Sequence, residues 1–121
     1  MNLDWKAILD QLPVAVFVKD AEGRYIYMNE FCAKHAGVSM KDIMGKTDKD
    51  IFSKETAEKI HIEDLSAIKH GHCLISGEEW TKRYSKDHLS FENEAVLKTV
   101  WEDPKTHRAG VFGIAVPHAK Q

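Results

Sequence analysis

The stretch from residue 14 to residue 29 constrains the fold more than any other part of the chain. Two runs rich in β-branched and aromatic residues, "VAVFVKD" and "RYIYMN", flank the short segment "AEG". Such residues favour strands, and a glycine-containing turn between two such runs is typical of a β-hairpin. The sequence therefore predicts an antiparallel hairpin near the N-terminus.

Helices are expected after the hairpin. Asn29 can cap a helix that ends at Gly37. Ser53 can cap the longest helix, which is expected to end at Gly71. Ser39 and Thr47 each precede an aspartate by three residues, which is the spacing of a capping box; those aspartates are Asp42 and Asp50.

Three strand-like segments follow the helices, at roughly 73–83, 89–101 and 110–117. The turn-like stretches "SKDH" and "EDPKTHRAG" separate them. The order of helix, two strands, several helices and three strands predicts an α+β domain. Its expected core is a five-stranded antiparallel sheet with the helices grouped on one face.

A short amphipathic helix is expected before the hairpin, with Asp4 as its N-cap and Pro13 as its stop. Its apolar residues recur at i, i+3, i+4 and i+7 and form one stripe. Because such a stripe must be buried, we expect this helix to cover its own sheet or, preferentially, to join two subunits in a homodimer. The predicted interface residues are Trp5, Ile8, Leu9 and Leu12.

Composition excludes several classes of protein. A chain of 121 residues that is 43% hydrophobic and 30% charged is expected to form one globular domain. A net charge of -2 argues against a nucleic-acid partner. The longest apolar run, "PVAVFV", is too short to cross a bilayer, and no signal peptide is visible. Cys32 and Cys73 form no CxxC, so reduced thiols in a cytoplasmic protein are expected.

The triplet Gly45-Lys46-Thr47 is the end of a phosphate-binding loop motif. That motif requires a glycine five residues before the triplet, so that backbone N–H groups can surround the phosphates. The residue at that position is Met40. A nucleotide site is therefore not expected, and helix capping is the better interpretation of Thr47.

Taken together, these segments resemble the PAS sensor family over nearly the whole chain. "LPVAVFVKDAEGRYIYMNEFCAKHAG" is similar to the family's opening, and "IMGKTDKDIF" to its junction of short helices. "IEDLSAIKHG" resembles the long helix that precedes the third strand, and "AGVFGIAV" the last strand. The resemblance divides the chain into an N-terminal helix at 1–12, a sensory domain at 13–117 and a tail at 118–121.

The resemblance implies a sensory module that holds a small ligand between sheet and long helix, or that dimerises. PAS domains are usually found beside a histidine kinase, a cyclic-dinucleotide enzyme or a transcription regulator, so an effector domain is expected in the same full-length chain. One departure concerns signalling. Pro117 stands about where many PAS domains have the aspartate of an Asp-Ile-Thr-like motif.

The long helix and the last three strands supply the expected pocket. At about 100° per residue, Ala57, Ile60, Leu65 and Ile68 define an apolar face of the helix. His61 is predicted near the centre of that face, with Asp64 beside it. On each strand, alternate residues point to opposite faces of the sheet, and the sequence does not determine which set faces the helix. The predicted pocket residues are His61, Asp64, Leu65, Trp80, Val96, Leu97, Phe112 and Ile114.

Four alternatives to an unidentified ligand stay open. In a haem-binding PAS sensor, His61 would be the iron ligand, although the residues after it, "IEDLSAI", lack the aromatic side chains of such sensors. Flavin has no positive sign, because the reactive cysteine motif of light sensors is absent. A small enzyme would use His61 as a base and Asp64 to orient it. A ligand-free module would only dimerise. Separately, no metal site is predicted, since His70 and His72 lack a third ligand.

Overall fold

The computed structural model describes residues 3–36, 38–76 and 93–117. Trp80 and Gly37, named above, lie outside these residues. The elements, in chain order, are α1 (Trp5–Asp10), β1 (Ala15–Lys19), β2 (Tyr25–Met28), α2 (Glu30–Ala36), α3 (Met40–Ile43), α4 (Asp48–Ile51), α5 (Lys54–His70), β3 (His72–Ser76), β4 (Asn93–Glu102) and β5 (Ala109–Pro117).

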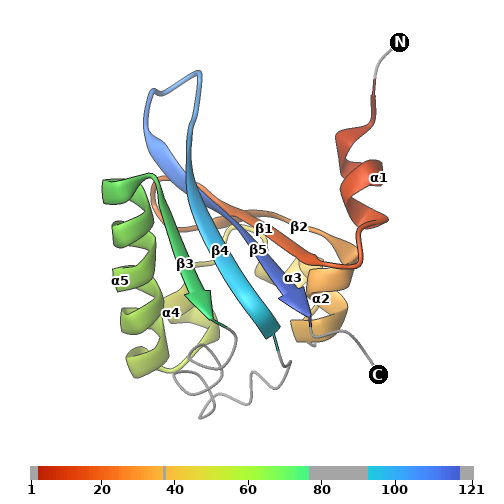
Figure 1. Ribbon diagram of the computed structural model, residues 1–121, viewed down its shortest axis with the longest axis horizontal. Coiled ribbons are helices and arrows are strands. Elements are labelled where there is room, and N and C mark those ends of the chain that lie inside the picture. The colour runs from red at the N-terminus through yellow and green to blue at the C-terminus, as the bar shows by residue number, and fades with distance from the viewer. Residues whose placement is uncertain (1–2, 37, 77–92, 118–121) are drawn as a thin grey trace.

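The five strands form one antiparallel sheet in the order β2-β1-β5-β4-β3 (Figure 1). The predicted hairpin is β1–β2, in which Phe17 pairs with Met28. Gly23 adopts a φ of +78° in the connecting turn, a conformation that glycine reaches without strain. The α+β class and the five-stranded antiparallel sheet are therefore confirmed.

Most of the predicted helix caps are present. In each, a side-chain oxygen accepts a hydrogen bond from a backbone N–H in the first turn, which satisfies a group that the helix itself leaves unpaired. Gly71 ends α5 in the left-handed region, with a φ of +89°. The Asp4 side chain accepts from the Ala7 N–H at 3.1 Å. The Asn29 side chain accepts from the Cys32 N–H at 3.0 Å, and the Ser53 side chain from the Thr56 N–H at 3.2 Å.

The two predicted capping boxes differ. At the start of α4, the Asp50 carboxylate accepts from the Thr47 backbone N–H at 3.0 Å and from the Thr47 hydroxyl at 3.1 Å. At the start of α3, Ser39 makes no side-chain cap hydrogen bond, so the prediction there was wrong. The Asp42 N–H donates at 3.0 Å to the Ser39 backbone carbonyl, and the Ser39 side chain adds no bond to it.

The face of the sheet toward α5 carries the hydrophobic core. Ala15 and Val96 each pair with Ala115, and paired residues of neighbouring strands point to the same face. Ile60 of α5 packs against this group, as do partly buried side chains from α2, from β3 and from Phe52 at the end of α4. We call this the inner face.

The opposite face of the sheet, called the outer face here, is covered in part by α1. Trp5 and Leu9 of α1 line a groove together with Val18 of β1 and Phe112 of β5. The Trp5 and Tyr27 rings meet edge to face, with centroids 5.2 Å apart. Figure 1 shows α1 and α5 on opposite sides of the strands.

One tryptophan connects three strands on the outer face. The indole Nε1 of Trp101, on β4, donates a hydrogen bond of 3.0 Å to the carbonyl of Lys19, on β1. The indole passes over β5 at Gly110, the residue paired with Trp101. A Cβ atom at Gly110 would lie 2.3 Å from the Lys19 carbonyl oxygen and 2.6 Å from the indole Nε1. The position therefore requires glycine.

Candidate functional site

A buried lysine ends β1 on the inner face. Lys19 follows Ala15 and Phe17 at alternating positions, so the strand directs its side chain toward the helices. The Lys19 residue is 1% exposed. A buried ammonium group must be paired, because an unpaired charge in a protein interior is costly. Its Nζ forms ion pairs with Asp48 and with Asp64, the latter at 2.8 Å.

Aromatic groups complete the surroundings of the Lys19 ammonium. The Nζ atom lies 5.0 Å from the centroid of the Tyr25 ring and 5.9 Å from that of Phe17. Both distances are within the range of cation–π attraction. The Tyr25 hydroxyl donates a 2.6 Å hydrogen bond to Asp48, which fixes this carboxylate at the start of α4.

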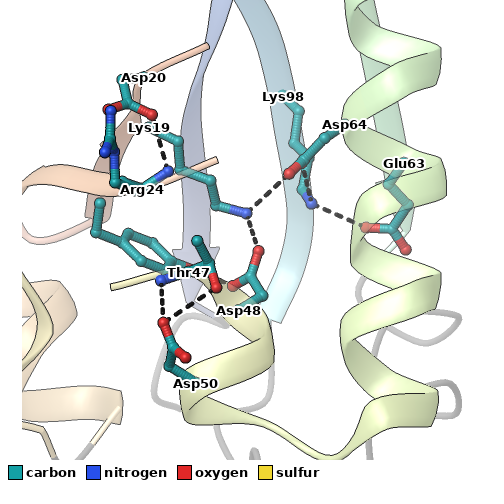
Figure 2. Close-up of polar contacts among 10 residues, drawn as sticks. Lys19, Asp20, Arg24, Thr47, Asp48, Asp50, Glu63, Asp64 and Lys98 are labelled. Carbon is teal, nitrogen blue, oxygen red and sulfur yellow. Dashed lines mark hydrogen bonds and ion pairs between the residues drawn. The ribbon is translucent and has the colours of Figure 1, made fainter. Parts of the chain in front are cut away.

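A second buried lysine extends the cluster along the sheet. Lys98 of β4 is 3% exposed. Its Nζ lies 2.9 Å from Asp64 and 3.1 Å from Glu63, both on α5 (Figure 2). We call the connected group the charge cluster; it contains three carboxylates and two ammonium groups, from Lys19, Asp48, Glu63, Asp64 and Lys98.

The pairing sets the protonation states inside the charge cluster. Burial alone would raise the pKa of the Asp64 carboxyl, but the positive charges of Lys98 and Lys19 outweigh it and hold that pKa below its usual value. Burial alone would lower the pKa of Lys98, but Asp64 and Glu63 raise it above the usual value. Burial and the Asp48 charge raise the pKa of Tyr25 well above 10.0. Asp64 and Lys98 are therefore charged at neutral pH, and Tyr25 is a neutral donor.

A cavity of about 230 Å³ adjoins the charge cluster. Two carboxylates of the cluster, Asp48 and Asp64, face it from α4 and α5. His61 also lines it, and the β1–β2 turn closes one side. We call this space the inner cavity; its remaining lining residues are Glu22, Gly23, Thr47, Lys49 and Ala57.

The predicted inward face of α5 was wrong in part. Ala57 and Ile60 are buried as expected, but Leu65 is 50% exposed and Ile68 is 39% exposed. His61 is exposed as well, and it lies at the edge of the inner cavity rather than at the centre of the buried face. The buried positions are taken instead by charged residues of the cluster, whose burial a hydropathy pattern does not predict.

The strand residues of the predicted pocket lie on two different faces. Val96 is 1% exposed on the inner face, where a ligand beneath α5 would lie. Phe112 and Ile114 point to the outer face, because they pair with Val18 and Val16 and alternate with inward residues. Leu97 pairs with Ile114 and shares that face. The placement of these outer residues beneath α5 was wrong, since a shift of one residue in register exchanges the faces.

The geometry does not fit haem. The inner cavity is smaller than the roughly 300–1,000 Å³ of sites that hold drug-sized molecules. Its walls include the Asp48 and Asp64 carboxylates, which would be costly against an apolar porphyrin. The haem alternative for His61 is therefore not supported by the residues around it.

The enzyme alternative requires Asp64 to orient His61, and the structure does not show that contact. Both oxygens of Asp64 accept hydrogen bonds from lysines, Oδ1 from Lys98 and Oδ2 from Lys19. Asp64 is therefore committed to the charge cluster and does not orient His61. Within the part of the chain that the structure describes, no three His, Cys, Asp or Glu residues are grouped to hold a metal ion.

Sequence reasoning missed four members of the charge cluster: Lys19, Asp48, Glu63 and Lys98. A signal for the two lysines was present. In "AVFVK" and "AVLK", a lysine occupies the same alternating position as apolar inward residues, which indicates a buried cation with a partner elsewhere. Nothing comparable marked Asp48 or Glu63.

The groove on the outer face, called the outer groove here, has a volume of about 490 Å³. It is mostly apolar and lies between α1 and the sheet. Trp5 of α1, which lines the groove, is exposed, and so are Ile8 of α1 and Leu12, which follows the helix. Exposed apolar residues of the sheet continue this surface: Ile26, Leu74, Leu97 and Val116.

None of the helices in the described part of the chain is long and apolar enough to span a membrane.

Comparison with known proteins gives a consistent result. A family model described as PAS fold matches residues 9–118. A diguanylate cyclase of Vibrio cholerae serotype O1 is 35% identical over 62 residues, which are 51% of this chain and 19% of that protein. The chain spans only 8% of the length of another curated relative.

Solved structures are similar in fold. A sensory box sensor histidine kinase of Vibrio cholerae has a TM-score of 0.68 at 16% identity, over 97% of this chain and 90% of that chain. VqmA of Vibrio cholerae has a TM-score of 0.67 at 18% identity, over 99% of this chain and 54% of that chain. VqmA has been solved bound to DPO and in a complex with a ligand and DNA. At these identities, the likeness is one of fold alone.

Proposed function

Because this chain belongs to the PAS fold family, whose members are sensory domains of signalling proteins, we propose that it is a sensory module that binds a small ligand in the inner cavity. The observation that carries the proposal is the cavity itself, which opens against two carboxylates between α4 and α5. A ligand there would contact three elements at once, the β1–β2 turn, α4 and α5, and so could change how they pack.

The proposed setting is a larger, cytoplasmic signalling protein in which this module regulates an effector domain. The length of the curated relatives supports this setting, because the chain covers less than a fifth of each. The division into a helix at 1–12, a sensory domain at 13–117 and a tail at 118–121 belongs to the same proposal. We assign no DNA contact to the module, given its net charge of -2.

Ligand binding is tested by closing the mouth of the inner cavity. A library of metabolites is screened by thermal shift, and compounds that co-purify are identified by native mass spectrometry. His61→Trp should abolish binding of any compound that stabilises the natural protein, because the larger ring narrows the opening. The fold should be unchanged, since His61 is exposed.

The matched control is His70→Trp, because His70 is exposed on the same helix and does not line the cavity. Equal binding by the natural protein and by both variants would place the ligand elsewhere. If no compound binds the natural protein, the ligand-free alternative gains support.

We further propose that the module forms a homodimer through its outer face. Trp5 of α1 lines the apolar outer groove and is exposed, as are Ile8 of α1 and Leu12 just after it, and an isologous pair would bury these side chains together with the groove. Leu9 is less exposed, because it lines the groove within one subunit.

Ile8→Asp should convert the dimer into a monomer, measured as solution mass by light scattering. Ile8 is 51% exposed, so the substitution leaves the subunit folded. Ile62→Asp is the control, because Ile62 is a similarly exposed apolar residue on α5. A natural protein that is monomeric at high concentration, or an equal loss of mass in both variants, would contradict the proposed interface.

A further inference from the structure

Polar contacts fix the C-terminal end of α1 to the rest of the domain. The carbonyl of Leu9 accepts a hydrogen bond of 3.0 Å from the Asn29 side chain. The Asp10 carboxylate accepts from the Tyr27 hydroxyl at 3.2 Å and from the Glu30 N–H at 3.0 Å. These bonds join the last two residues of α1 to β2, to α2 and to the residue between them.

Asn29 is the centre of this attachment. It is 0% exposed, and both atoms of its amide group take part in two hydrogen bonds. The Nδ2 group donates to the carbonyls of Leu9 and Val14, the latter at 2.9 Å. The Oδ1 atom accepts from the N–H groups of Val16 and Cys32, each at 3.0 Å. One buried side chain therefore holds α1, the segment after it, β1 and α2 in a single arrangement.

The packing of α1 contributes little to its own stability. The structure describes all six of its residues, and none of them is buried. Trp5 is 52% exposed and Ile8 is 51% exposed. Helices shorter than about 12 residues are marginal in water on their own, and segments with few buried apolar contacts open locally at a low free-energy cost. We therefore expect α1 to persist only while it is docked on the sheet.

The docked position of α1 creates the outer groove. Val16 and Tyr27 point to the outer face, yet they are only 1% and 6% exposed. Both line the groove, and Trp5 and Leu9 line it from α1. If α1 moves away, the groove loses this wall and the sheet residues become exposed. The surface proposed for dimerisation is thus complete only with α1 docked.

The segment after α1 permits such a movement. Gln11, Leu12 and Pro13 are exposed, and the pairing of β1 with β5 begins at Ala15. A rotation of the backbone within 11–13 would therefore release residues 3–12 without breaking a hydrogen bond of the sheet. We call residues 3–12 the N-terminal arm.

We propose that the N-terminal arm docks and undocks as a unit, that Asn29 and Asp10 hold the docked state, and that only the docked state dimerises. This inference rests on the proposed homodimer and names how it is regulated. Because an association that requires the docked state also stabilises it, dimerisation and docking should strengthen each other.

Hydrogen exchange followed by mass spectrometry tests the movement of the arm. In the natural protein, amides of the arm should exchange faster than those of β4 and β5. Their exchange should slow as the protein concentration is raised through the Kd of the dimer. Exchange of the arm as slow as that of β5 would show that it opens only with the whole domain, and exchange as fast as in an unfolded peptide would show that it is never docked. Either result would overturn the proposal.

Asp10→Ala removes two of the contacts that hold the arm and leaves Asn29 in place. It should speed the exchange of the arm by about tenfold, the factor expected for losing hydrogen bonds to a charged group that is half-exposed. The Kd of the dimer should rise as well, while β4 and β5 keep their exchange rates. Equal acceleration in the sheet would indicate a general loss of stability and would contradict the proposal.

The matched control for Asp10→Ala is Asp103→Ala. Asp103 is also half-exposed, and its carboxylate accepts a backbone hydrogen bond from the Lys105 N–H at 2.8 Å. Because this residue lies in the turn between β4 and β5, its substitution should change neither the exchange of the arm nor the Kd of the dimer. Equal effects of the two variants on the arm would count against the assigned role of Asp10.

Asn29→Asp tests the buried contact. Aspartate keeps an acceptor for the N–H groups of Val16 and Cys32, but it has no donor for the carbonyls of Leu9 and Val14. The exchange of the arm should therefore rise further than in Asp10→Ala, and unchanged exchange would contradict the role of Asn29. Asp10→Ala decides the proposal if Asn29→Asp does not fold.

The homodimer and its regulation fail in different ways. If the natural protein dimerises but Asp10→Ala changes neither the Kd nor the exchange of the arm, the regulation is wrong and the homodimer stands. If the natural protein is monomeric at high concentration, both are wrong.

Discussion

Replacing Lys19 by methionine should lower the free energy of unfolding by about 3–5 kcal/mol, the cost typical of removing one partner from a buried ion pair. The variant leaves Asp48 without its cation, and Asp64 keeps only Lys98. Methionine preserves most of the side-chain volume, so the loss reflects charge rather than a cavity. Urea unfolding at neutral pH measures the difference.

Two further variants separate charge from packing at Lys19. Lys59→Met removes a half-exposed i,i+4 pair with Glu55 and should cost no more than about 0.5 kcal/mol. The double variant Lys19→Met/Asp48→Asn should be more stable than Lys19→Met, because it removes the uncompensated carboxylate while Tyr25 keeps an acceptor. A loss below about 1 kcal/mol for Lys19→Met would show that the charge cluster contributes little to stability.

Gly110→Ala should cost about 2–3 kcal/mol, through overpacking and the loss of a partly buried hydrogen bond. The added Cβ meets a backbone atom, the Lys19 carbonyl oxygen, which belongs to the neighbouring part of the sheet and cannot turn away. It also displaces the Trp101 indole from that carbonyl. The free energy of unfolding is again the measurement.

The Trp101→Phe background shows which contact dominates at Gly110. Phenylalanine lacks the indole Nε1, so the contact at 2.6 Å is removed while the contact at 2.3 Å with the Lys19 carbonyl oxygen remains, and Gly110→Ala should still destabilise the protein in that background. Full tolerance of alanine there would mean that the indole alone excludes it. Gly45→Ala is the control for backbone strain, because Gly45 has a φ of +82° and no neighbour within 4 Å of an added Cβ.

The sequence was sufficient for the order of elements because their signals are local. The β1–β2 hairpin, the caps at Asp4, Asn29 and Ser53, and the end of α5 at Gly71 each depend on a few adjacent residues. Local patterns also led to the sheet, since the number and order of strands left few alternatives.

The site was harder to predict because it depends on partners distant in the chain. Glu63 and Asp64 can be buried because cations distant in the chain lie opposite them: Lys98, more than thirty residues away, pairs with both, and Lys19 pairs with Asp64. A hydropathy pattern gives no reason to bury a residue such as Glu63. The inward face of α5 was therefore predicted from its apolar residues and included Leu65 and His61. The faces of β5 depended on register, which a strand with apolar residues at most positions does not reveal.

The hydrogen bond from Trp101 has a consequence for how substitutions on the two faces combine. Lys19 belongs to both faces at once, since its ammonium lies in the charge cluster and its carbonyl accepts from an indole that lines the outer groove. A change that moves this residue from either side alters the contacts on the other. We therefore expect the charge cluster and the outer groove to be coupled through Lys19, so that mutations in the two should show epistasis rather than simple additivity.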